Sequence, residues 1–369
     1  MDSLHIVSFD NPYPPNYGGV IDVFYKLKAF KAAGIKVTLH VFEYGRRRYP
    51  DLDAYCYAVY YYKRRTFVNP FIGSLPYIVS TRNDLQLLQR LNDDKAPILF
   101  EGLHSCYFLD HPDLKHRFKM VRMHNIEHDY YRKLEDVEQN FFKKYFFAKE
   151  ADRLERFEQV LQHANLILAI SFNDEQTLLK RYPQVRLLPA FHANEEVTSI
   201  AGRGKYAFYH GNLSVGENDE AAKFLVNEVF HDLNIPFIIA GNNPSDALKK
   251  AVANYSHIQL LQHASTDEIN QLTRDAQVNV LPTFQSTGIK LKLINVLYQG
   301  RWVLVNNMMV ENTGLADLCM IANTSAEMKS AIKKVFELPF EEAALSKRKE
   351  ILSKAFCNQT NIQSLINLM

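Results

Sequence analysis

The alternation of strand-like and helix-like segments is the feature that most constrains the fold of this chain. Residues 4–9 ("LHIVSF") predict a strand, residues 18–34 predict a helix that ends at Gly34, and residues 35–42 predict a second strand with apolar residues at alternate positions. This order is typical of a β-α-β unit, in which the two strands are parallel and the crossover is right-handed. The start of the chain therefore predicts a parallel sheet.

The same alternation continues along the chain in two series. The first series has further strands at residues 96–100, 118–123 and 165–170, and Ser171 then caps the next helix. The second series has strands at residues 205–211, 235–241, 257–262, 278–282 and 301–306, with helices between them. Together the two series predict an α/β fold of two doubly wound, Rossmann-like domains.

The length of the chain, 369 residues, suits two domains of ordinary size. We expect an N-terminal domain at residues 1–190, a second domain at residues 191–350, and a C-terminal helix within residues 351–369 that packs back on the N-terminal domain. Ligands of open α/β sheets bind beyond the carboxyl ends of the strands. We therefore expect the two domains to face a cleft lined by strand-end loops.

The composition excludes several classes of function. A net charge of +2 gives no electrostatic case for binding nucleic acid. Four cysteines lie far apart without a Cys-x-x-Cys pair, which is typical of reduced thiols rather than of a disulfide framework. The first residues lack the segments of a signal peptide, and no run reaches the ~18 apolar residues of a membrane span. We expect a cytoplasmic protein that is at most peripheral to a membrane.

The stretch "TFQSTGIKLKLINVLYQG" follows the strand at residues 278–282 and predicts a mostly apolar helix. Four polar or small residues, Gly288, Lys292, Asn295 and Gln299, recur at the spacing of one helical face. This face is either exposed to solvent or part of an anion site at the helix start. We favour the anion site, because the stretch follows a strand end and helix N-termini attract anions. Lys292 would then contact a phosphate and Asn295 a sugar hydroxyl.

Other loops at predicted strand ends carry further candidates. The loop "DNPYPPNYGG" leads into a helix at Gly18 and Gly19, which suit either a structural turn or an anion-binding loop. It does not match the G-x-G-x-x-G dinucleotide fingerprint. In the second series, Gly211 and Asn212 follow the first strand. The strand at residues 96–100 is followed by Glu101 and His104, both weaker candidates.

A histidine-rich loop follows the strand at residues 118–123. His124, Glu127 and His128 match the H-x-x-E-H pattern of a metallopeptidase class. That chemistry requires both histidines on a helix, whereas His124 follows a strand directly. We therefore interpret His124 as a residue that binds a ligand at the strand end, and the alternative is a histidine that satisfies local backbone groups. No metal site is predicted.

With these segments together, the chain resembles the retaining glycosyltransferases of the GT-B fold in the large group-one family. The resemblance spans nearly the whole chain and is carried by "PYPPNYGG", "RMHNIEH", "YHGNLSVGEN" and, above all, "LPTFQSTGIKLKLINVLYQGRWVLVNN". It implies a nucleotide diphosphate sugar held mainly by the C-terminal domain and an acceptor held mainly by the N-terminal domain. It also implies transfer with retention, domain closure about the linker and no obligatory metal or other cofactor.

The resemblance also implies roles for individual residues. Gly18 and Gly19 match the loop near the donor phosphates, and His124 matches a histidine near the transferred sugar. Gly211 matches the glycine of the second domain's first loop. Gly288 and Lys292 match the family's Gly-x-x-x-Lys helix, whose lysine contacts phosphate.

Three positions depart from the family pattern. Many relatives carry two glutamates eight positions apart in the donor loop and helix, where this chain has Thr287 and Asn295. A basic residue often follows the glycine at Gly211, and here Asn212 takes its place. We expect Thr287 and Asn212 near the donor phosphates and Asn295 or Glu101 near the ribose or the sugar.

These observations predict a hexosyltransferase that moves a sugar from a nucleotide diphosphate sugar to a saccharide or lipid-linked saccharide, in surface polysaccharide or glycolipid synthesis. The leaving diphosphate would help to deprotonate the acceptor. The alternatives are a nucleotide-sugar epimerase of the same fold, a non-catalytic sugar-nucleotide-binding protein and, more remotely, a metallopeptidase. No nucleic-acid partner is expected.

Residues 46–82 interleave Arg and Lys with many aromatic residues. Two interpretations of this segment remain open. It is either a surface that lies against an anionic membrane and receives a lipid-linked sugar, or an aromatic strand with a solvated basic rim.

Overall fold

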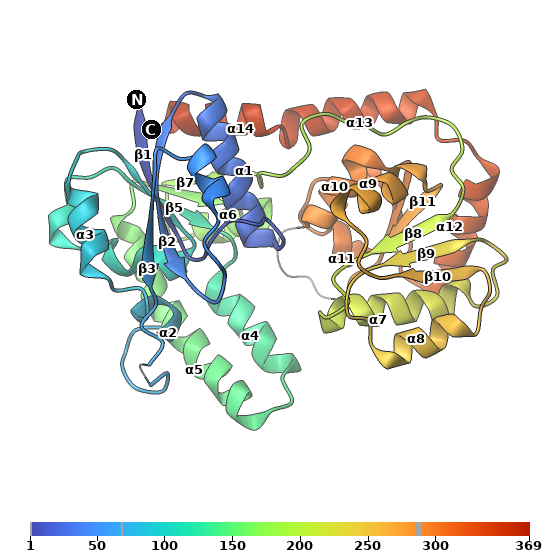
Figure 1. Ribbon diagram of the computed structural model, residues 1–369, viewed down its shortest axis with the longest axis horizontal. Helices are drawn as coiled ribbons and strands as arrows, with labels where there is room; N and C mark the ends of the chain where they lie inside the picture. The colour runs from blue at the N-terminus through green and yellow to red at the C-terminus, as the bar shows by residue number, and fades with distance from the viewer. Residues whose placement is uncertain (1, 68, 285–289) are drawn as a thin grey trace. The chain divides into compact units, whose positions relative to one another are not determined.

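The computed structural model describes residues 2–67, 69–284 and 290–369. Within these residues the chain forms two compact units, which are described separately below (Figure 1). The N-terminal unit consists of the chain up to Ala193 together with Phe356–Met369, and the C-terminal unit runs from Asn194 to Ala355.

A parallel sheet of seven strands forms the centre of the N-terminal unit, in the order β3-β2-β1-β4-β5-β6-β7. The strands are β1 (Ser3–Ser8), β2 (Lys36–Glu43), β3 (Ala58–Lys63), β4 (Ile98–Glu101), β5 (Lys119–Met123), β6 (Leu166–Ala169) and β7 (Val185–Leu187). The order reverses direction at β1, so the doubly wound arrangement places a switch point between β1 and β4, where ligands of such sheets bind.

Helices cover both faces of this sheet. They are α1 (Gly18–Ala32), α2 (Tyr77–Ser80), α3 (Leu85–Asn92), α4 (Glu127–Val137), α5 (Phe141–Phe157), α6 (Phe172–Leu179) and α14 (Asn358–Leu368). As predicted, α6 begins after Ser171, whose hydroxyl accepts a hydrogen bond from the backbone N–H of Asp174. The last helix, α14, packs beside α1 and buries Ile362 and Leu365 in the same apolar cluster as Leu27.

The C-terminal unit has a parallel sheet of six strands in the order β10-β9-β8-β11-β12-β13. Its strands are β8 (Ala207–His210), β9 (Phe237–Ala240), β10 (Ile258–Leu261), β11 (Val278–Leu281), β12 (Trp302–Val305) and β13 (Met320–Ile321). Its helices are α7 (Gly216–Phe224), α8 (Asp246–Ala253), α9 (Thr266–Asp275), α10 (Leu291–Gln299), α11 (Asn307–Val310), α12 (Ser325–Glu337) and α13 (Glu342–Ala355). A π-helical segment, Leu225–Phe230, continues α7.

The two parallel sheets confirm the predicted α/β class, and each strand predicted from apolar alternation exists within a few residues of its expected limits. The predicted start of the donor helix at Gly288 lies outside the described residues, in which α10 begins at Leu291. The sequence analysis did not place the edge strands β7 and β13, which are only three and two residues long. It also missed the helical hairpin of α4 and α5. Among the described residues, no helix is long and apolar enough to cross a membrane.

Candidate functional site

The first strand-end loop of the N-terminal unit leaves the start of α1 without a capping side chain. Tyr17 is the N-cap residue, but its hydroxyl donates to the Asp10 carboxylate at 2.8 Å instead of capping the helix. A Cβ atom at Gly19 would lie 2.7 Å from the ring of Phe9, whereas one at Gly18 would meet no described atom within 4 Å. The loop after β1 therefore approaches α1 closely at Gly19, and no described side chain caps the first backbone N–H groups of the helix. Both features suit an anion-binding loop.

His124 lies at the carboxyl end of β5 and is hydrogen-bonded to Glu101 at the end of β4. His124 Nε2 lies 2.9 Å from Glu101 Oε2. Burial by itself raises the pKa of Glu101, but Lys26 and the His124 hydrogen bond lower it below its usual value. An ionised carboxylate can only accept, so Nε2 carries the proton of this bond. His124 Nδ1 is buried, lies 4.0 Å from Asp22 Oδ2 and has no hydrogen-bond partner among the described residues.

Glu101 is itself part of a buried charge network that the sequence analysis missed. Lys26 Nζ lies 2.9 Å from Asp22 Oδ2 and 2.7 Å from Glu101 Oε1, and the guanidinium of Arg122 bonds both oxygens of Asp22 at 3.1 Å. The side chains of Asp22, Lys26, Glu101 and Arg122 have no exposed surface. Burial raises the pKa of Asp22, but Arg122 and Lys26 outweigh this effect and hold it below its usual range. The two carboxylates and two cations thus compensate each other.

The network occupies the one cluster of potential metal ligands found among the described residues. Ligand atoms of Asp22, Glu101 and His124 lie within 4.8 Å of one another. The ammonium group of Lys26 bonds both carboxylates, and Arg122 adds a second positive charge. A divalent cation there would meet two permanent cations, so the donor set does not suit a metal ion.

The three residues of the H-x-x-E-H pattern have three different partners. His124 bonds Glu101, Glu127 Oε2 lies 3.7 Å from His104 Nε2, and His128 Nδ1 lies 3.2 Å from Glu158 Oε2. Burial raises the pKa of Glu127 to about 8, and burial lowers the pKa of His104 well below its usual value. The pattern therefore does not form a shared ligand position, which argues against the metallopeptidase alternative.

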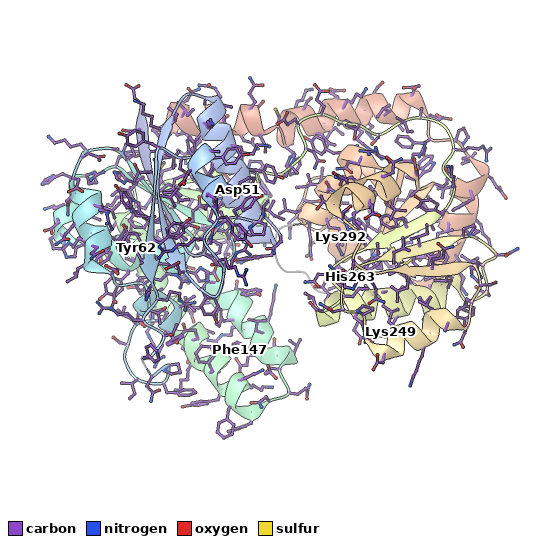
Figure 2. All side chains as sticks on the ribbon, viewed as in Figure 1. Asp51, Tyr62, Phe147, Lys249, His263 and Lys292 are labelled. Carbon is purple, nitrogen blue, oxygen red and sulfur yellow. The ribbon has the colours of Figure 1, made fainter. Side chains whose placement is uncertain are left out.

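In the C-terminal unit, Lys292 lies in the first turn of α10 (labelled in Figure 2) and reaches across to the first turn of α7. Its Nζ donates to Asn218 Oδ1 at 2.9 Å and lies 4.9 Å from the centre of the Tyr209 ring. A Cβ atom at Gly211 would lie only 2.9 Å from this Nζ, so glycine leaves room for the ammonium group. Burial lowers the pKa of Lys292 to about 8, with Glu217 opposing and Lys290 adding to the shift.

Two helices that begin near Lys292 lack capping side chains. α7 starts after Val215 and α10 starts after Lys290, and neither residue provides a side-chain cap. Three other helices of the unit, α8, α9 and α12, begin with the capping residues Ser245, Ser265 and Thr324. No described side chain caps these two starts, whose backbone N–H groups suit an anionic acceptor, and Lys292 provides a positive charge beside them. The arrangement suits a phosphate group.

The polar face of α10 points inward rather than to solvent. Gln299 is 7% exposed and its amide donates to Asn295 at 3.0 Å and to Asn194 at 2.8 Å. The interpretation of this face as the solvent side is therefore wrong at Gln299. Asn295 is half-buried, with its oxygen engaged by Gln299. The predicted contacts of Thr287 and Gly288 lie outside the described residues.

Asn212 organises the loop after β8. Its side-chain oxygen accepts hydrogen bonds from the backbone N–H and the hydroxyl of Ser214 at 3.2 and 2.7 Å. Its backbone oxygen accepts from Asn218 Nδ2 at 3.0 Å, so it fixes the residue that holds Lys292. The predicted contact of Asn212 with phosphate stays a prediction.

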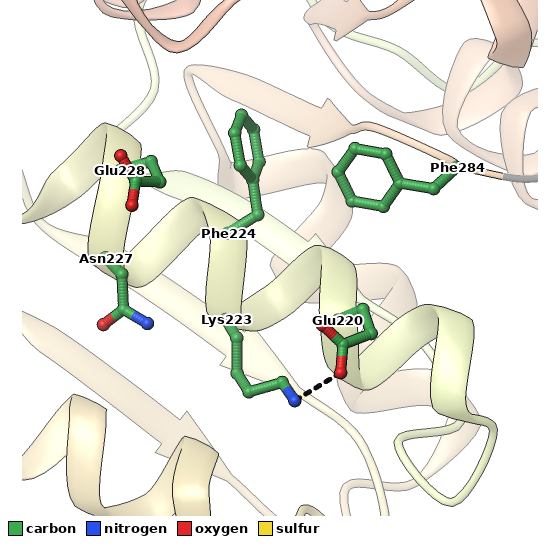
Figure 3. A pocket seen from close by; sticks show the side chains of 6 residues that line it. All are labelled: Glu220, Lys223, Phe224, Asn227, Glu228 and Phe284. Carbon is green, nitrogen blue, oxygen red and sulfur yellow. Dashed lines mark hydrogen bonds and ion pairs between the residues drawn. The ribbon is translucent and has the colours of Figure 1, made fainter.

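An open pocket of about 570 Å³ lies along α7 and the π-helical segment (Figure 3). Its lining residues are Glu220, Lys223, Phe224, Asn227, Glu228 and Phe284. The rings of Phe224 and Phe284 meet edge to face at 5.5 Å, and Lys223 pairs with Glu220. Since the lysine at its wall already pairs with Glu220, we assign no ligand to this pocket.

The residues that the sequence analysis missed carry a common signal. Lys26 and Asp22 stand four positions apart on a helix whose other buried residues are apolar, and Arg122 stands within an apolar strand. Charged residues inside apolar segments are rare unless they are paired. This pattern identifies them as buried charges, but it does not identify their partners.

The comparisons with known proteins identify a fold but no family. No protein-family model matches the chain. An uncharacterized 44.6 kDa protein in the cps region of Klebsiella pneumoniae is 26% identical over 335 residues, which cover 85% of each chain. Among solved structures, HepE from Anabaena in complex with UDP and glucose is similar with a TM-score of 0.66 and 10% identity, over 100% of this chain and 99% of that one.

Two further structures with the same architecture are similar over nearly their whole length. A glycosyltransferase from Rickettsia africae has a TM-score of 0.68 and 11% identity, over 100% of this chain and 97% of that one. Sucrose-phosphate synthase from Thermosynechococcus elongatus has a TM-score of 0.61 and 13% identity, over 99% and 95%. This chain has the GT-B fold. The fold predicted from the sequence is confirmed, and the GT-B loops after β1, β5 and β8 contain the candidate residues Gly18, His124 and Gly211.

Proposed function

We propose that the protein is a glycosyltransferase that moves a sugar from a nucleotide diphosphate sugar to a saccharide or glycolipid acceptor. The observation that carries the proposal is Lys292, held beside Gly211 at the uncapped start of α10. The GT-B fold and the UDP and glucose named for HepE support a nucleotide-sugar donor. The cps region named for the Klebsiella relative supports a role in polysaccharide synthesis.

The C-terminal unit would bind the donor. Lys292 and the backbone N–H groups at the starts of α7 and α10 would hold the diphosphate, and Thr287 and Gly288 would contribute as the resemblance implies. Asn295 would hydrogen-bond the ribose or the sugar after releasing Gln299. Because Gly211 has no side chain, the diphosphate can approach the backbone of the loop after β8.

The N-terminal unit would contribute contacts to the transferred sugar and to the acceptor. His124 would contact the transferred sugar from its position directly after β5. Glu101 has no exposed surface, so we reassign it from the sugar contact expected above to the positioning of His124. The N–H groups at Gly18 and Gly19 would face the donor phosphates.

We propose that the reaction proceeds with retention and that the leaving diphosphate accepts the acceptor proton on the same face of the sugar. The carbon–oxygen bond to the diphosphate breaks as the bond to the acceptor oxygen forms, and the proton passes to a diphosphate oxygen. The protein would stabilise the developing charge through Lys292 and the helix N–H groups. The position of Lys292 supports a mechanism with no obligatory metal.

A thermal-shift screen tests the donor site. The purified protein would be heated with UDP, GDP, ADP and their common sugar conjugates, with and without Mg²⁺. A competent donor at a hundred times its Kd is expected to add ~2.7 kcal/mol of stability, and the shift is expected without Mg²⁺. Failure of every nucleotide to shift the melting temperature would overturn the donor site. A shift without transfer to any acceptor would identify the second candidate, a sugar-nucleotide-binding protein, which the replacement of the family glutamates by Thr287 and Asn295 favours.

Donor affinity is expected to fall as the pH rises above about 8. Burial lowers the pKa of Lys292 to about 8, so the free protein loses this positive charge at higher pH. A bound diphosphate, itself ionised with a second pKa of about 6, stabilises the charged ammonium. Binding therefore takes up a proton above pH ~8, and Kd is expected to rise by up to about tenfold per pH unit. Titration calorimetry with the nucleotide measures this, and the matching nucleoside, which lacks phosphate, is the control. The same pH profile for both would contradict a role for Lys292 at the phosphates.

A further inference from the structure

Exposed aromatic and aliphatic side chains gather on one part of the N-terminal unit, at the ends of α4 and α5 and in the segment before α2. They are Phe67, Phe71, Ile72, Leu75, Val137, Phe141, Phe142 and Tyr145, which we call the aromatic hairpin surface. Phe141 and Phe142 are each 75% exposed and Ile72 is 71% exposed. Scattered exposed apolar residues are ordinary, but a gathered set marks an interaction surface.

Specific contacts join the two segments into one surface. The rings of Phe71 and Tyr145 stack at 5.8 Å, and Phe71 meets Phe146 edge to face at 6.3 Å. The guanidinium of Arg153 donates to the backbone oxygens of Pro70 and Phe71 at 2.6 and 3.0 Å. The hairpin extends away from the sheet of this unit, with Phe147 on α5 (Figures 1 and 2). These contacts thus hold the segment before α2 against α5.

Basic residues outnumber acidic ones on this surface, although Glu135, Asp136 and Glu138 flank Val137. Residues 63–75 and 141–149 contain six Lys and Arg and no Asp or Glu. Five of the six, Lys63, Arg65, Lys143, Lys144 and Lys149, are exposed. The acidic residues of the hairpin lie at its turn and further along α5, where Arg132 pairs with Asp152 at 2.8 Å.

This combination favours a bilayer over a protein partner. Lysine is depleted in the core of protein–protein interfaces, whereas aromatic rings beside Lys and Arg suit the boundary between lipid headgroups and acyl chains. The lysine stems can lie along the apolar layer while the ammonium groups reach anionic headgroups. We propose that the aromatic hairpin surface docks the protein on an anionic lipid bilayer.

The surface differs from the membrane-facing segment expected from the sequence. In residues 46–64 the arginines lie over tyrosine rings, with Arg48 at 4.6 Å from the centre of Tyr61 and Arg64 at 4.2 Å from that of Tyr44. Residues 58–63 form strand β3, so this part is the aromatic strand with a basic rim. The exposed surface begins at Phe67 and overlaps the expected segment in four residues, Phe67, Phe71, Ile72 and Leu75. Its other four residues, Val137, Phe141, Phe142 and Tyr145, come from α4 and α5, outside that segment.

Vesicle flotation with the full chain tests the proposal. Vesicles of phosphatidylcholine with phosphatidylglycerol are compared with vesicles of phosphatidylcholine alone. We expect the wild-type protein to bind the anionic vesicles and to release as salt screens the charges. The double variant Phe141→Ser with Phe142→Ser and the double variant Lys143→Glu with Lys144→Glu are each expected to lower the partition coefficient by at least about tenfold. Leu85→Ser is the matched control, because Leu85 is 63% exposed on α3, outside the surface, and should leave binding unchanged.

Three results would overturn the proposal. They are no binding of the wild-type protein to anionic vesicles, an equal loss in Leu85→Ser, and a wild-type dimer in sedimentation velocity that the Phe141/Phe142 variant dissociates. The last result would assign the surface to a second copy of the chain. The proposal does not rest on the glycosyltransferase function. The nucleotide thermal shift of the same variants tests the donor site separately from bilayer binding. Melting temperatures near the wild-type value show that the variants fold.

Discussion

Lys26→Met is expected to lower the free energy of unfolding by about 3–5 kcal/mol, because it leaves two buried carboxylates with one permanent cation. Lys26 bonds both Asp22 and Glu101 and has no exposed surface. Met matches the length of the lysine stem, so the cost comes from the charge rather than from a cavity. The remaining cation, Arg122, bonds Asp22 and does not replace Lys26 at Glu101.

Urea denaturation followed by circular dichroism measures this loss. Lys28→Met on the same helix is the matched control, since Lys28 is half-buried beside the ring of Tyr25 and its removal should cost less than about 1 kcal/mol. Adding Glu101→Gln to Lys26→Met should recover part of the loss, because the second carboxylate then needs no cation. Equal stabilities of the Lys26 and Lys28 variants would show that the network is not a compensated set of charges.

Lys292→Ala is expected to lower kcat/KM by about 100- to 1000-fold, the usual cost of removing one donor that stabilises transition-state charge. Its effect on stability should stay near 1 kcal/mol, because Asn218 loses one hydrogen bond in a half-buried place. The comparison of kcat/KM with the melting temperature separates the two effects. Losses of activity that merely follow the melting temperature would contradict the assigned role.

One control and one second probe accompany this variant. Lys249→Ala is the control, because it removes an exposed lysine paired with Asp246 in the same unit and should leave transfer unchanged (Figure 2 labels Lys249). Gly211→Ala is the second probe, because its Cβ would lie 2.9 Å from Lys292 Nζ. We expect Gly211→Ala to weaken donor binding and Lys249→Ala to leave it unchanged. Equal effects of these two alanines would argue against Lys292 as the phosphate contact.

The strand-end positions of His124 and Gly211 could be predicted because each directly follows a short apolar segment that has few alternatives to a buried strand. The orientation of the polar face of α10 could not be predicted in this way. Gln299 is polar at a helical spacing that suits solvent, and only its partner Asn194, 105 residues away in the chain, explains its burial. The strand-end position of Glu101 predicted a contact with the ribose or the sugar, but its side chain is hydrogen-bonded to His124 and has no exposed surface.

The sequence by itself determined the order of the central strands and most of the helices between them, the parallel sheets and the loops in which a ligand could bind. These features depend on local periodicity and on glycine at strand ends, which short stretches of sequence display. Only the tertiary structure decided which buried charges compensate each other, because Asp22 and Arg122 stand 100 residues apart and meet through the sheet order. It also decided that Phe141 and Phe142 are exposed, since the same aromatic residues on another helix face would lie in a core.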